Sequence, residues 1–459
     1  MPSRTLYQVF DILFKRASVC HSKSKVSYDL KLRNGRSRMP RFFCVSKRKY
    51  AEFKRSILGV RGLETFMLKI ASLFSGCGGL DLGFVGGFHY LGKPFERLDT
   101  EIVFANDFDK DAVTCYNSNE LLAAAGTDCL LDDIRNVDAD VIPDFDILLA
   151  GFPCQPFSNA GNRKGVNDDN GRGTLFEECE RIIKSKVELG KKPKAFVFEN
   201  VRGILSSKMQ DGETPVPQEI KSRMEHLGYN VAMQLVCSSD YGVPQKRYRV
   251  LIVGLDSCSS TFDFDSMRKV VETNCIPSTS FGRDEKLLLG SILQNVGSAP
   301  DNSIWDFSET TQKTVELIGG CRHGMNAMKL FVGDFSKNDL PPIVFEGRSW
   351  KDIPYEKLSP RFKRIADDPQ RYHAPKFFRR FAFGEINGTI TASAQPENCG
   401  ITHPVENRRY SVRECARIQS FPDDFVFGSI PLQSQYKVIG NAVPPVMAWV
   451  LAKALLNYL

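Results

Sequence analysis

Residues 69–84 of this 459-residue chain read KIASLFSGCGGLDLGF, an apolar segment that runs into a cluster of glycines. The first six residues predict a buried β-strand, and the apolar residues after the glycines predict a helix. Glycines between a strand and a helix let a ligand approach the backbone closely. No Lys-Ser or Lys-Thr pair ends this loop, so a nucleoside without phosphates fits it better than a nucleotide held by a P-loop.

Strands and helices alternate from this point to about residue 256, which indicates a mostly parallel α/β sheet. Residues 257–388 lack a steady period and predict a second, smaller domain. Order returns at 410–425 and in an amphipathic helix at 446–459. We expect strands at 69–74, 101–105, 145–150, 195–199, 230–237 and 249–255, and helices at 79–86, 110–118, 174–187 and 219–227.

The composition is that of a globular protein, with 42% hydrophobic and 25% charged residues. No run of about 18 apolar residues occurs, so no transmembrane helix is expected. Thirteen cysteines without a Cys-x-x-Cys pair argue against a zinc site or a disulfide framework and suit a reducing cytoplasm. Residues 1–70 carry 17 Lys and Arg against 4 Asp and Glu, which predicts a basic N-terminal extension that contacts a polyanion or is simply solvated.

A second segment, GFPCQPFS at 151–158, places Cys154 between two prolines. Each proline fixes its own φ and pushes the preceding residue toward extended geometry, so this backbone is stiff. A stiff backbone suits a nucleophile, because misplacement by about 1 Å can cost on the order of 100-fold in rate. The alternative is a buried free cysteine. We expect that structural role for Cys77, Cys115 and Cys415, which lie within apolar or helical patterns.

Polar residues follow several predicted strands, at the edge where open α/β sheets bind ligands. Asp107 can accept hydrogen bonds from both ribose hydroxyls, Phe108 can stack on an adenine, and Asp133 can accept from an adenine amino group. Taken singly, each acid is more typical of a solvated loop than of a binding site. Glu199 ends another apolar strand, where a carboxyl in a dry site can donate a proton.

Three basic segments are candidates for nucleic-acid contact. The stretch 245–249, QKRYR, offers guanidinium groups to a carbonyl or a phosphate. Residues 158–173 form a polar loop with four glycines, which suits a mobile basic lid beside Cys154. A basic and aromatic cluster at 373–383 can read a groove, contact phosphates or fill a small core.

In their order along the chain, eight blocks resemble the cytosine-5 DNA methyltransferase family, in its bacterial restriction–modification form. The resemblance covers about residues 67–256 and 389–459. It implies an S-adenosylmethionine-dependent, Rossmann-like sheet with a smaller, irregular target-recognition domain. The blocks are 74–79, the strand end at Asp107, 133–134, 153–157, 199–201, 245–249, 413–422 and 440–445.

The resemblance also implies roles for individual residues. Cys154 adds as a thiolate to C6 of a flipped-out cytosine, Glu199 holds the N3 edge, and Arg249 contacts O2. S-adenosylmethionine is the methyl donor, and no metal is implied. The implied donor pocket consists of Phe74, Gly76, Gly78, Gly79, Asp107, Phe108, Asp133, Ile134, Pro153, Leu175, Asn441 and Val443. We expect DNA contacts from Ser158, Arg163, Lys164, Gln245, Arg247, Arg379 and Arg380.

The expected product is 5-methylcytosine at a specific site in duplex DNA. This methylation is expected to protect the host DNA from a cognate restriction endonuclease. We expect a monomer in the bacterial cytoplasm, with no membrane association. The predicted divisions are an extension at 1–66, a catalytic and donor-binding domain at 67–256, a target-recognition domain at 257–388, and a return segment with a C-terminal helix at 389–459. Alternatives are a tRNA cytosine-5 methyltransferase and a non-catalytic DNA-binding regulator on the same scaffold.

Overall fold

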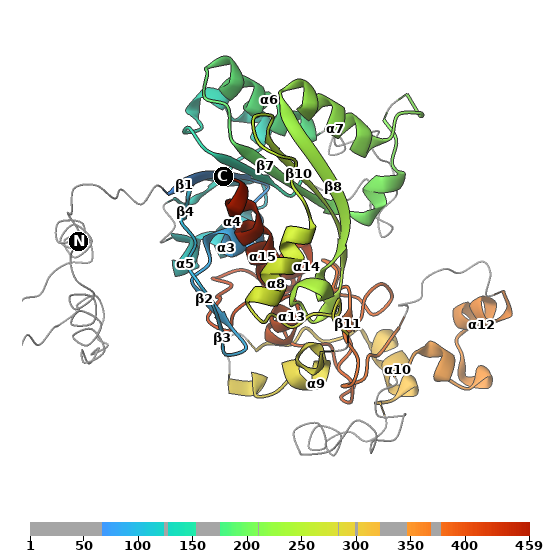
Figure 1. The fold of residues 1–459 in the computed structure, drawn as a ribbon. Coiled ribbons are helices and arrows are strands. Elements are labelled where there is room, and N and C mark those ends of the chain that lie inside the picture. The colour runs from blue at the N-terminus through green and yellow to red at the C-terminus, as the bar shows by residue number, and fades with distance from the viewer. Residues whose placement is uncertain are drawn as a thin grey trace, which may run out of the picture. The chain divides into compact units, whose positions relative to one another are not determined.

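Seven strands form one sheet in the order β5-β4-β1-β6-β7-β10-β8 (Figure 1). The computed structural model describes residues 67–123, 127–152, 175–209, 211–282, 284–298, 302–321, 347–368 and 378–459. Each of the six strands expected from sequence is present, within two residues of its expected bounds. The strands are β1 (Leu68–Leu73), β4 (Thr100–Asp107), β5 (Cys129–Leu131), β6 (Ile147–Ala150), β7 (Ala195–Val201), β8 (Tyr229–Cys237) and β10 (Tyr248–Asp256).

The sheet is mostly parallel, as predicted. Strands β5, β4, β1, β6 and β7 run in one direction, whereas β10 is antiparallel to both β7 and β8. The connection from β8 to β10 spans only residues 238–247. A parallel crossover needs a dozen or more residues, so β10 must turn back beside β8.

The strand order reverses between β1 and β6. The chain proceeds outward from β1 to β4 and β5, and then places β6 on the other side of β1. Leu73 and Ala150, the last residues of β1 and β6, are paired. Open α/β sheets bind ligands outside such a reversal, at the carboxyl ends of the strands. The glycine loop after β1 and the segment after β6 therefore begin side by side.

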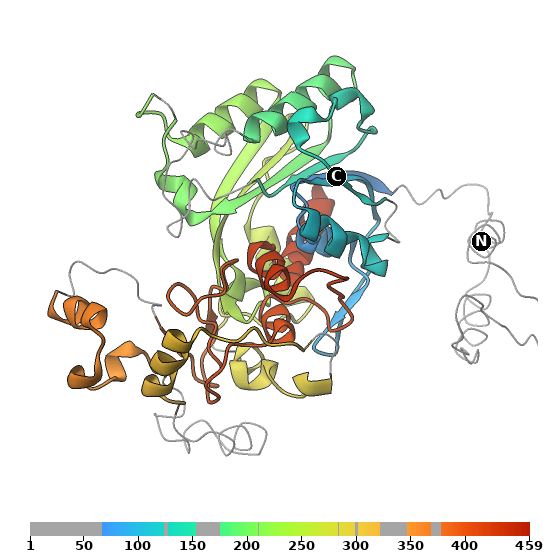
Figure 2. The same ribbon diagram turned by 180° about the vertical axis from the view of Figure 1, so that it is seen from behind.

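Helices cover both faces of the sheet, because alternate strand residues enter two different cores. Ile147 and Leu149 lie in one core, and Leu148 and Ala150 lie in the other. Helices α6 (Phe176–Glu188) and α7 (Val216–His226) pack side by side over the second core (Figure 2). The first core includes residues of α3 (Gly79–Val85), α4 (Lys110–Asn117), α5 (Glu120–Ala123), α8 (Asp265–Thr273), α13 (Val412–Ile418), α14 (Leu432–Asn441) and α15 (Pro445–Leu455).

The C-terminal helix α15 packs against α3, which follows the glycine loop. A Cβ on Gly83 would lie 2.3 Å from the Cβ of Ala448, so the glycine permits this close helix contact. The stretch Leu432–Tyr458 is long and apolar enough to cross a membrane, but 83% of its most apolar window is buried inside the protein. Its apolar character is therefore explained by the core, and the far end of the chain returns to β1 as expected.

One hairpin was not expected from the sequence. Strands β2 (Phe88–Tyr90) and β3 (Lys93–Phe95) are joined by Leu91 and Gly92, with φ values of +47° and +77°. Positive φ at both central residues is typical of a type I′ turn. Three-residue strands are too short to show a period, which is why the pattern missed them.

The predicted region 257–388 divides between two cores. Residues of α8 and α9 (Leu289–Ile292) join the core of the sheet. A separate small core contains residues of α10 (Glu309–Ile318) and α12 (Pro360–Asp367), with Trp350 stacked on Phe362 at 5.5 Å. The short strands β9 (Gln245–Lys246) and β11 (Asn387–Gly388) pair in parallel. This contact joins the end of the region to the segment between β8 and β10.

Candidate active site

The loop after β1 turns into α3 through residues with positive φ, namely Phe74 (+55°), Gly76 (+58°) and Gly78 (+84°). A Cβ on Gly76 would meet no atom within 4 Å, so this backbone faces open space. A Cβ on Gly79 would lie 2.4 Å from the carbonyl oxygen of Val443. The loop is therefore open to a ligand at Gly76 and tightly packed against the C-terminal segment at Gly79.

Asp107, at the end of β4, is bonded to the glycine loop. Its Oδ2 accepts a hydrogen bond from the backbone N–H of Gly76 at 2.8 Å, and its Oδ1 accepts from the N–H of Asp109 at 2.8 Å. Burial raises the pKa of Asp107, and these backbone hydrogen bonds oppose the shift. Each carboxylate oxygen has a second acceptor site, so the group can still take ribose hydroxyls while it holds the loop.

Asn106 is a positioning residue that the sequence analysis missed. Its side chain is buried and donates to the carbonyl oxygens of Leu130 at 3.1 Å and Asp132 at 2.9 Å. Its own carbonyl accepts from the N–H of Ser75 at 3.0 Å. Asn106 thereby connects the ends of β1, β4 and β5. A polar residue beside Asp107 in an otherwise apolar strand was the available signal.

Two large apolar side chains are exposed next to Asp107. Phe108 is 63% exposed and Leu131 is 47% exposed. Asp107 pairs with Leu131 across β4 and β5, so the two apolar groups lie at the same sheet edge. An aromatic face left in solvent beside an open glycine loop suits stacking on a planar base.

Asp133 begins the turn after β5 and is engaged with Arg135. Its carboxylate accepts from the backbone N–H of Arg135 at 3.0 Å and forms an ion pair with the guanidinium at 2.5 Å. These hydrogen bonds from Arg135 lower the pKa of Asp133, which favours the ionised acceptor form. Ile134 is buried, whereas the Asp133 side chain is 34% exposed.

Glu199 and Arg249 form an ion pair at the carboxyl edge. The distance from Arg249 Nε to Glu199 Oε1 is 2.6 Å, and the two side chains are 11% and 10% exposed. The pairing of Leu251 with Glu199 across β10 and β7 places Arg249 and Glu199 on the same face of the sheet. The guanidinium also donates to the carbonyl of Tyr248 at 2.8 Å. The structure thus brings together two of the three predicted catalytic residues.

The segment that leads to Cys154 begins beside this pair. A Cβ on Gly151 would lie 3.7 Å from Oε2 of Glu199. The amide of Asn200 donates to the carbonyl of Phe152 at 3.5 Å. Leu175, where α6 begins, is buried. The remaining predicted residues of this segment lie outside the described residues, namely Pro153, Cys154, Ser158, Arg163 and Lys164.

Arg247 requires a correction, because it is not placed to contact DNA. Its side chain is 1% exposed and donates to the carbonyls of Ile390 at 3.0 Å, Gly440 at 3.0 Å and Asn441 at 3.3 Å. A charge buried in this way needs such acceptors. Arg247 therefore positions the segment that carries Asn441 and Val443 toward the glycine loop.

Gln245 and Arg380 are corrected for the same reason. Gln245 is fully buried, donates to Gln419 Oε1 at 2.7 Å and accepts from the N–H of Ile390 at 3.0 Å. Arg380 is 1% exposed and donates to the Asn407 side chain at 2.9 Å. These buried contacts join parts of the protein and leave no surface for DNA. Arg379 is more exposed and forms an ion pair with Glu385 at 2.6 Å.

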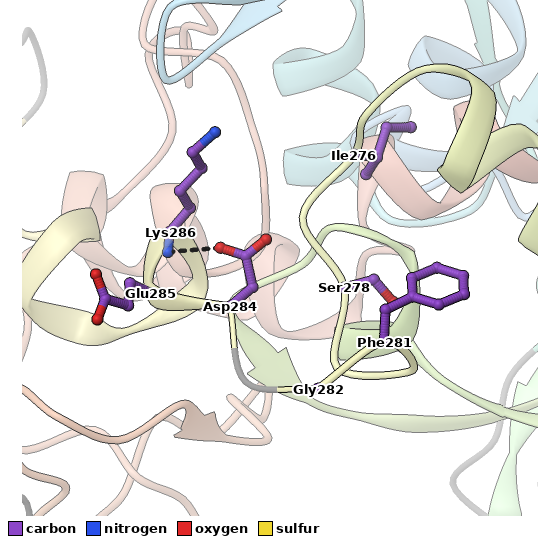
Figure 3. A pocket seen from close by; sticks show the side chains of 7 residues that line it. All are labelled: Ile276, Ser278, Phe281, Gly282, Asp284, Glu285 and Lys286. Atoms are coloured by element: carbon purple, nitrogen blue, oxygen red, sulfur yellow. Dashed lines mark hydrogen bonds between the residues drawn. The ribbon is translucent and has the colours of Figure 1, made fainter. Parts of the chain in front are cut away.

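A shallow pocket elsewhere does not contain these groups (Figure 3). In its lining, Asp284 accepts from the backbone N–H of Lys286 at 2.9 Å, and Ser278 donates to the carbonyl of Asp240 at 2.8 Å. Two of its polar side chains, Asp284 and Ser278, are thus used in local hydrogen bonds. Among the residues that the structure describes, no three His, Cys, Asp or Glu side chains are grouped to hold a metal.

Open backbone at the strand-order reversal, with an acid–arginine pair two strands away, is the arrangement of an α/β enzyme that holds a nucleoside-type group beside a second substrate. Comparison with known proteins makes the assignment specific. The chain belongs to the C-5 cytosine-specific DNA methylase family, whose profile matches residues 68–457. It is therefore a DNA cytosine-5 methyltransferase that uses a methyl donor.

Similar proteins include the type II methyltransferase M.FnuDI of Fusobacterium nucleatum, which is 31% identical over 84% of this chain and 93% of the relative. The type II methyltransferase M.NgoFVII of Neisseria gonorrhoeae is 33% identical over 84% of this chain and 86% of the relative. Among solved structures, the S. pombe Dnmt2 methyltransferase superposes with a TM-score of 0.51 at 15% identity, over 85% of this chain and 98% of that one. At that identity the likeness concerns the fold alone.

Proposed function

We propose that this protein methylates C5 of one cytosine within a specific duplex DNA sequence, through a covalent adduct between Cys154 and C6 of a flipped-out base. S-adenosylmethionine is the methyl donor. The observation that carries the proposal is the ion pair of Glu199 and Arg249, with Oε2 of Glu199 lying next to Gly151. Cys154 follows Gly151 by three residues, so their Cα atoms are separated by at most about 11 Å. The nucleophile is therefore within reach of a base held by this pair.

The chemistry needs a nucleophile because C5 of cytosine is too electron-poor to attack a sulfonium methyl group. The Cys154 thiolate adds to C6 and makes C5 nucleophilic, so one prohibitive step becomes several easier ones. Glu199 holds the N3 edge and donates a proton or a hydrogen bond as charge develops there. Arg249 contacts O2 and fixes the orientation of Glu199 through the 2.6 Å contact. Loss of the C5 proton then expels Cys154 and releases 5-methylcytosine.

The donor site is assigned to the strand-order reversal. The open backbone at Gly76, the spare acceptor sites of Asp107 and the exposed ring of Phe108 fit a nucleoside without phosphates. When bound there, S-adenosylmethionine supplies an electrophilic methyl group. Asp133 accepts from the adenine amino group. Pro153, Leu175, Asn441 and Val443 complete the proposed lining.

A cytosine within a duplex is inaccessible to the Cys154 thiolate, so the base must be flipped out at a cost of a few kcal/mol. The role of a lid over the flipped base is assigned to the glycine-rich segment 158–173, which lies outside the described residues, and target recognition is assigned to residues 257–388. DNA contacts remain assigned to Ser158, Arg163, Lys164 and Arg379. The relatives named type II methyltransferases support a role in protecting DNA from a restriction endonuclease with the same target. The protein is proposed to act on DNA as a monomer in the bacterial cytoplasm.

The mechanism is tested by trapping. A duplex with 5-fluorocytosine at the target position should form a stable covalent complex with the wild-type protein, because fluorine cannot leave C5 as a proton. Cys154→Ala should form none while it still binds the donor. Cys258→Ala, which alters an exposed cysteine, is the matched control and should trap normally. Turnover of ordinary cytosine without trapping by the wild type would contradict the covalent mechanism.

Transfer of a labelled methyl group from the donor to each nucleic acid separates the rival functions. A tRNA methyltransferase would label tRNA in preference to duplex DNA, whereas we expect label in duplex DNA alone. A regulator without catalysis would bind DNA and transfer no methyl group to either acceptor.

A further inference from the structure

Side chains at 245–249 alternate between the interior and the solvent. Gln245 and Arg247 are buried, whereas Lys246 and Tyr248 are exposed, Tyr248 by 44%. Successive residues of a strand point to opposite faces, so this alternation is expected for β9 and the start of β10. The polar residues of this stretch that face solvent are therefore not the ones that the sequence analysis selected.

Arg202, the residue that follows β7, lies beside Tyr248. The last pair between β10 and β7 joins Arg249 to Val201, and the next residues along are Tyr248 and Arg202. The Arg202 guanidinium lies 5.9 Å from the centroid of the Tyr248 ring, within the range of a cation–π contact. Tyr248 thus restrains an exposed arginine at the edge of the sheet, where a free side chain would lose rotamer entropy on binding.

These residues adjoin the reacting pair. Arg249 follows Tyr248 directly, and Glu199 on β7 precedes Arg202 by three residues. Strand β7 ends and the antiparallel strand β10 begins at this edge of the sheet, where the segment leading to Cys154 also starts. A duplex that delivers a base to Glu199 and Arg249 must bring its backbone close to this edge.

The charges at this edge are available to a polyanion. Within the described part of the chain, no carboxylate forms an ion pair with Arg202 or Lys246. The neighbouring Cys237, burial and, more weakly, the Asp240 carboxylate raise the pKa of Tyr248. By contrast, the exposed Lys191 at the other end of β7 forms an ion pair with Asp144 at 2.8 Å.

We propose that Arg202, Lys246 and Tyr248 form a binding site for the DNA sugar–phosphate backbone next to the flipped nucleotide. Arg202 and Lys246 bind phosphates, and Tyr248 holds the Arg202 guanidinium in place. The inference rests on the proposed function in that the ligand is the substrate duplex. It adds a contact that positions the DNA and carries no sequence information.

The test is the salt dependence of binding to a fluorescent duplex of mixed sequence, measured by anisotropy. Each lost phosphate contact should flatten the slope of log K against log salt by about 0.9. Arg202→Ala and Lys246→Ala should each show that change, and Arg202→Lys should restore the slope. Tyr248→Ala should weaken binding with a smaller change in slope. Lys191→Ala removes a charge that is already paired at the far end of β7 and should leave the slope unchanged.

Donor affinity and thermal unfolding of each variant should match the wild type, which separates a DNA contact from a folding defect. The methylation rate of Arg202→Ala should fall more at subsaturating than at saturating DNA, so the defect appears mainly in KM. Unchanged salt slopes for Arg202→Ala and Lys246→Ala, with a wild type that binds and methylates DNA, would overturn this inference alone. A wild type with no salt-dependent DNA binding would overturn the proposed function as well.

Discussion

Arg247 provides the sharpest test of the structural assignment, because the sequence suggests a DNA contact and the structure places the side chain in the interior. Arg247→Ala removes a buried guanidinium that donates to three backbone carbonyls, those of Ile390, Gly440 and Asn441. Hydrogen bonds to charged groups each contribute about 1.5–3 kcal/mol, and neighbouring contributions do not add fully. The substitution also leaves carbonyls without donors in a dry site. We therefore expect the free energy of unfolding to fall by about 3–5 kcal/mol.

Lys246→Ala is the matched control, since the adjacent side chain is exposed. Its free energy of unfolding should stay within about 0.5 kcal/mol of the wild type. Both variants are measured by urea unfolding followed by circular dichroism, with the donor affinity of Arg247→Ala determined by calorimetry. That affinity should fall too, because the segment around Asn441 loses its anchor. An Arg247→Ala variant of unchanged stability, with a flattened salt slope of DNA binding, would refute the reasoning.

Three further changes address the donor site and the core behind it. Phe108→Ala should weaken donor binding roughly ten-fold in calorimetry, as expected for a lost stacking contact. The free energy of unfolding should not change, because the ring is 63% exposed. A donor affinity equal to that of the wild type would exclude stacking. Gly83→Ala should lower the free energy of unfolding by about 1–3 kcal/mol, since its Cβ would lie 2.3 Å from that of Ala448; an unshifted melting temperature would show that α3 and α15 do not pack this closely. Burial raises the pKa of Asp81 to about 6 from an ordinary value of 3.8, so the folded state holds its proton more tightly than the unfolded state. The stability contributed by Asp81 therefore falls as pH rises from about 4 to 6 and is constant above that. Between pH 5 and 7.5 the free energy of unfolding of the wild type should thus fall by about 1–2 kcal/mol relative to that of Asp81→Asn. A difference in unfolding free energy between the two proteins that does not change with pH would contradict the raised pKa.

Most of the sheet could be predicted because its strands are buried on both faces. Such strands read as continuous apolar runs, and 195–199 or 249–255 stand out without any alignment. The direction of β10 could not be read from its own residues, because it depends on the length of the connection from β8. The hairpin of β2 and β3 escaped because its strands are too short to show a period.

The contacts of the candidate site could not be predicted from the sequence. Glu199 and Arg249 each stand near the end of an apolar strand, but their 2.6 Å contact depends on the pairing of β7 with β10. A period of two in 245–249 identifies two faces and does not say which one is covered. Gln245 and Arg247 are satisfied by Ile390 and Gly440, which are far away in sequence. Only the folded structure could show that these polar side chains lie inside.

The central claim is most directly tested by bisulfite sequencing of DNA from a methylation-free host that expresses this chain. The account predicts 5-methylcytosine at one cytosine of a single short sequence with the wild type, and none with Cys154→Ala produced at the same level. Unmodified DNA from cells that contain soluble, donor-binding wild-type protein would contradict it.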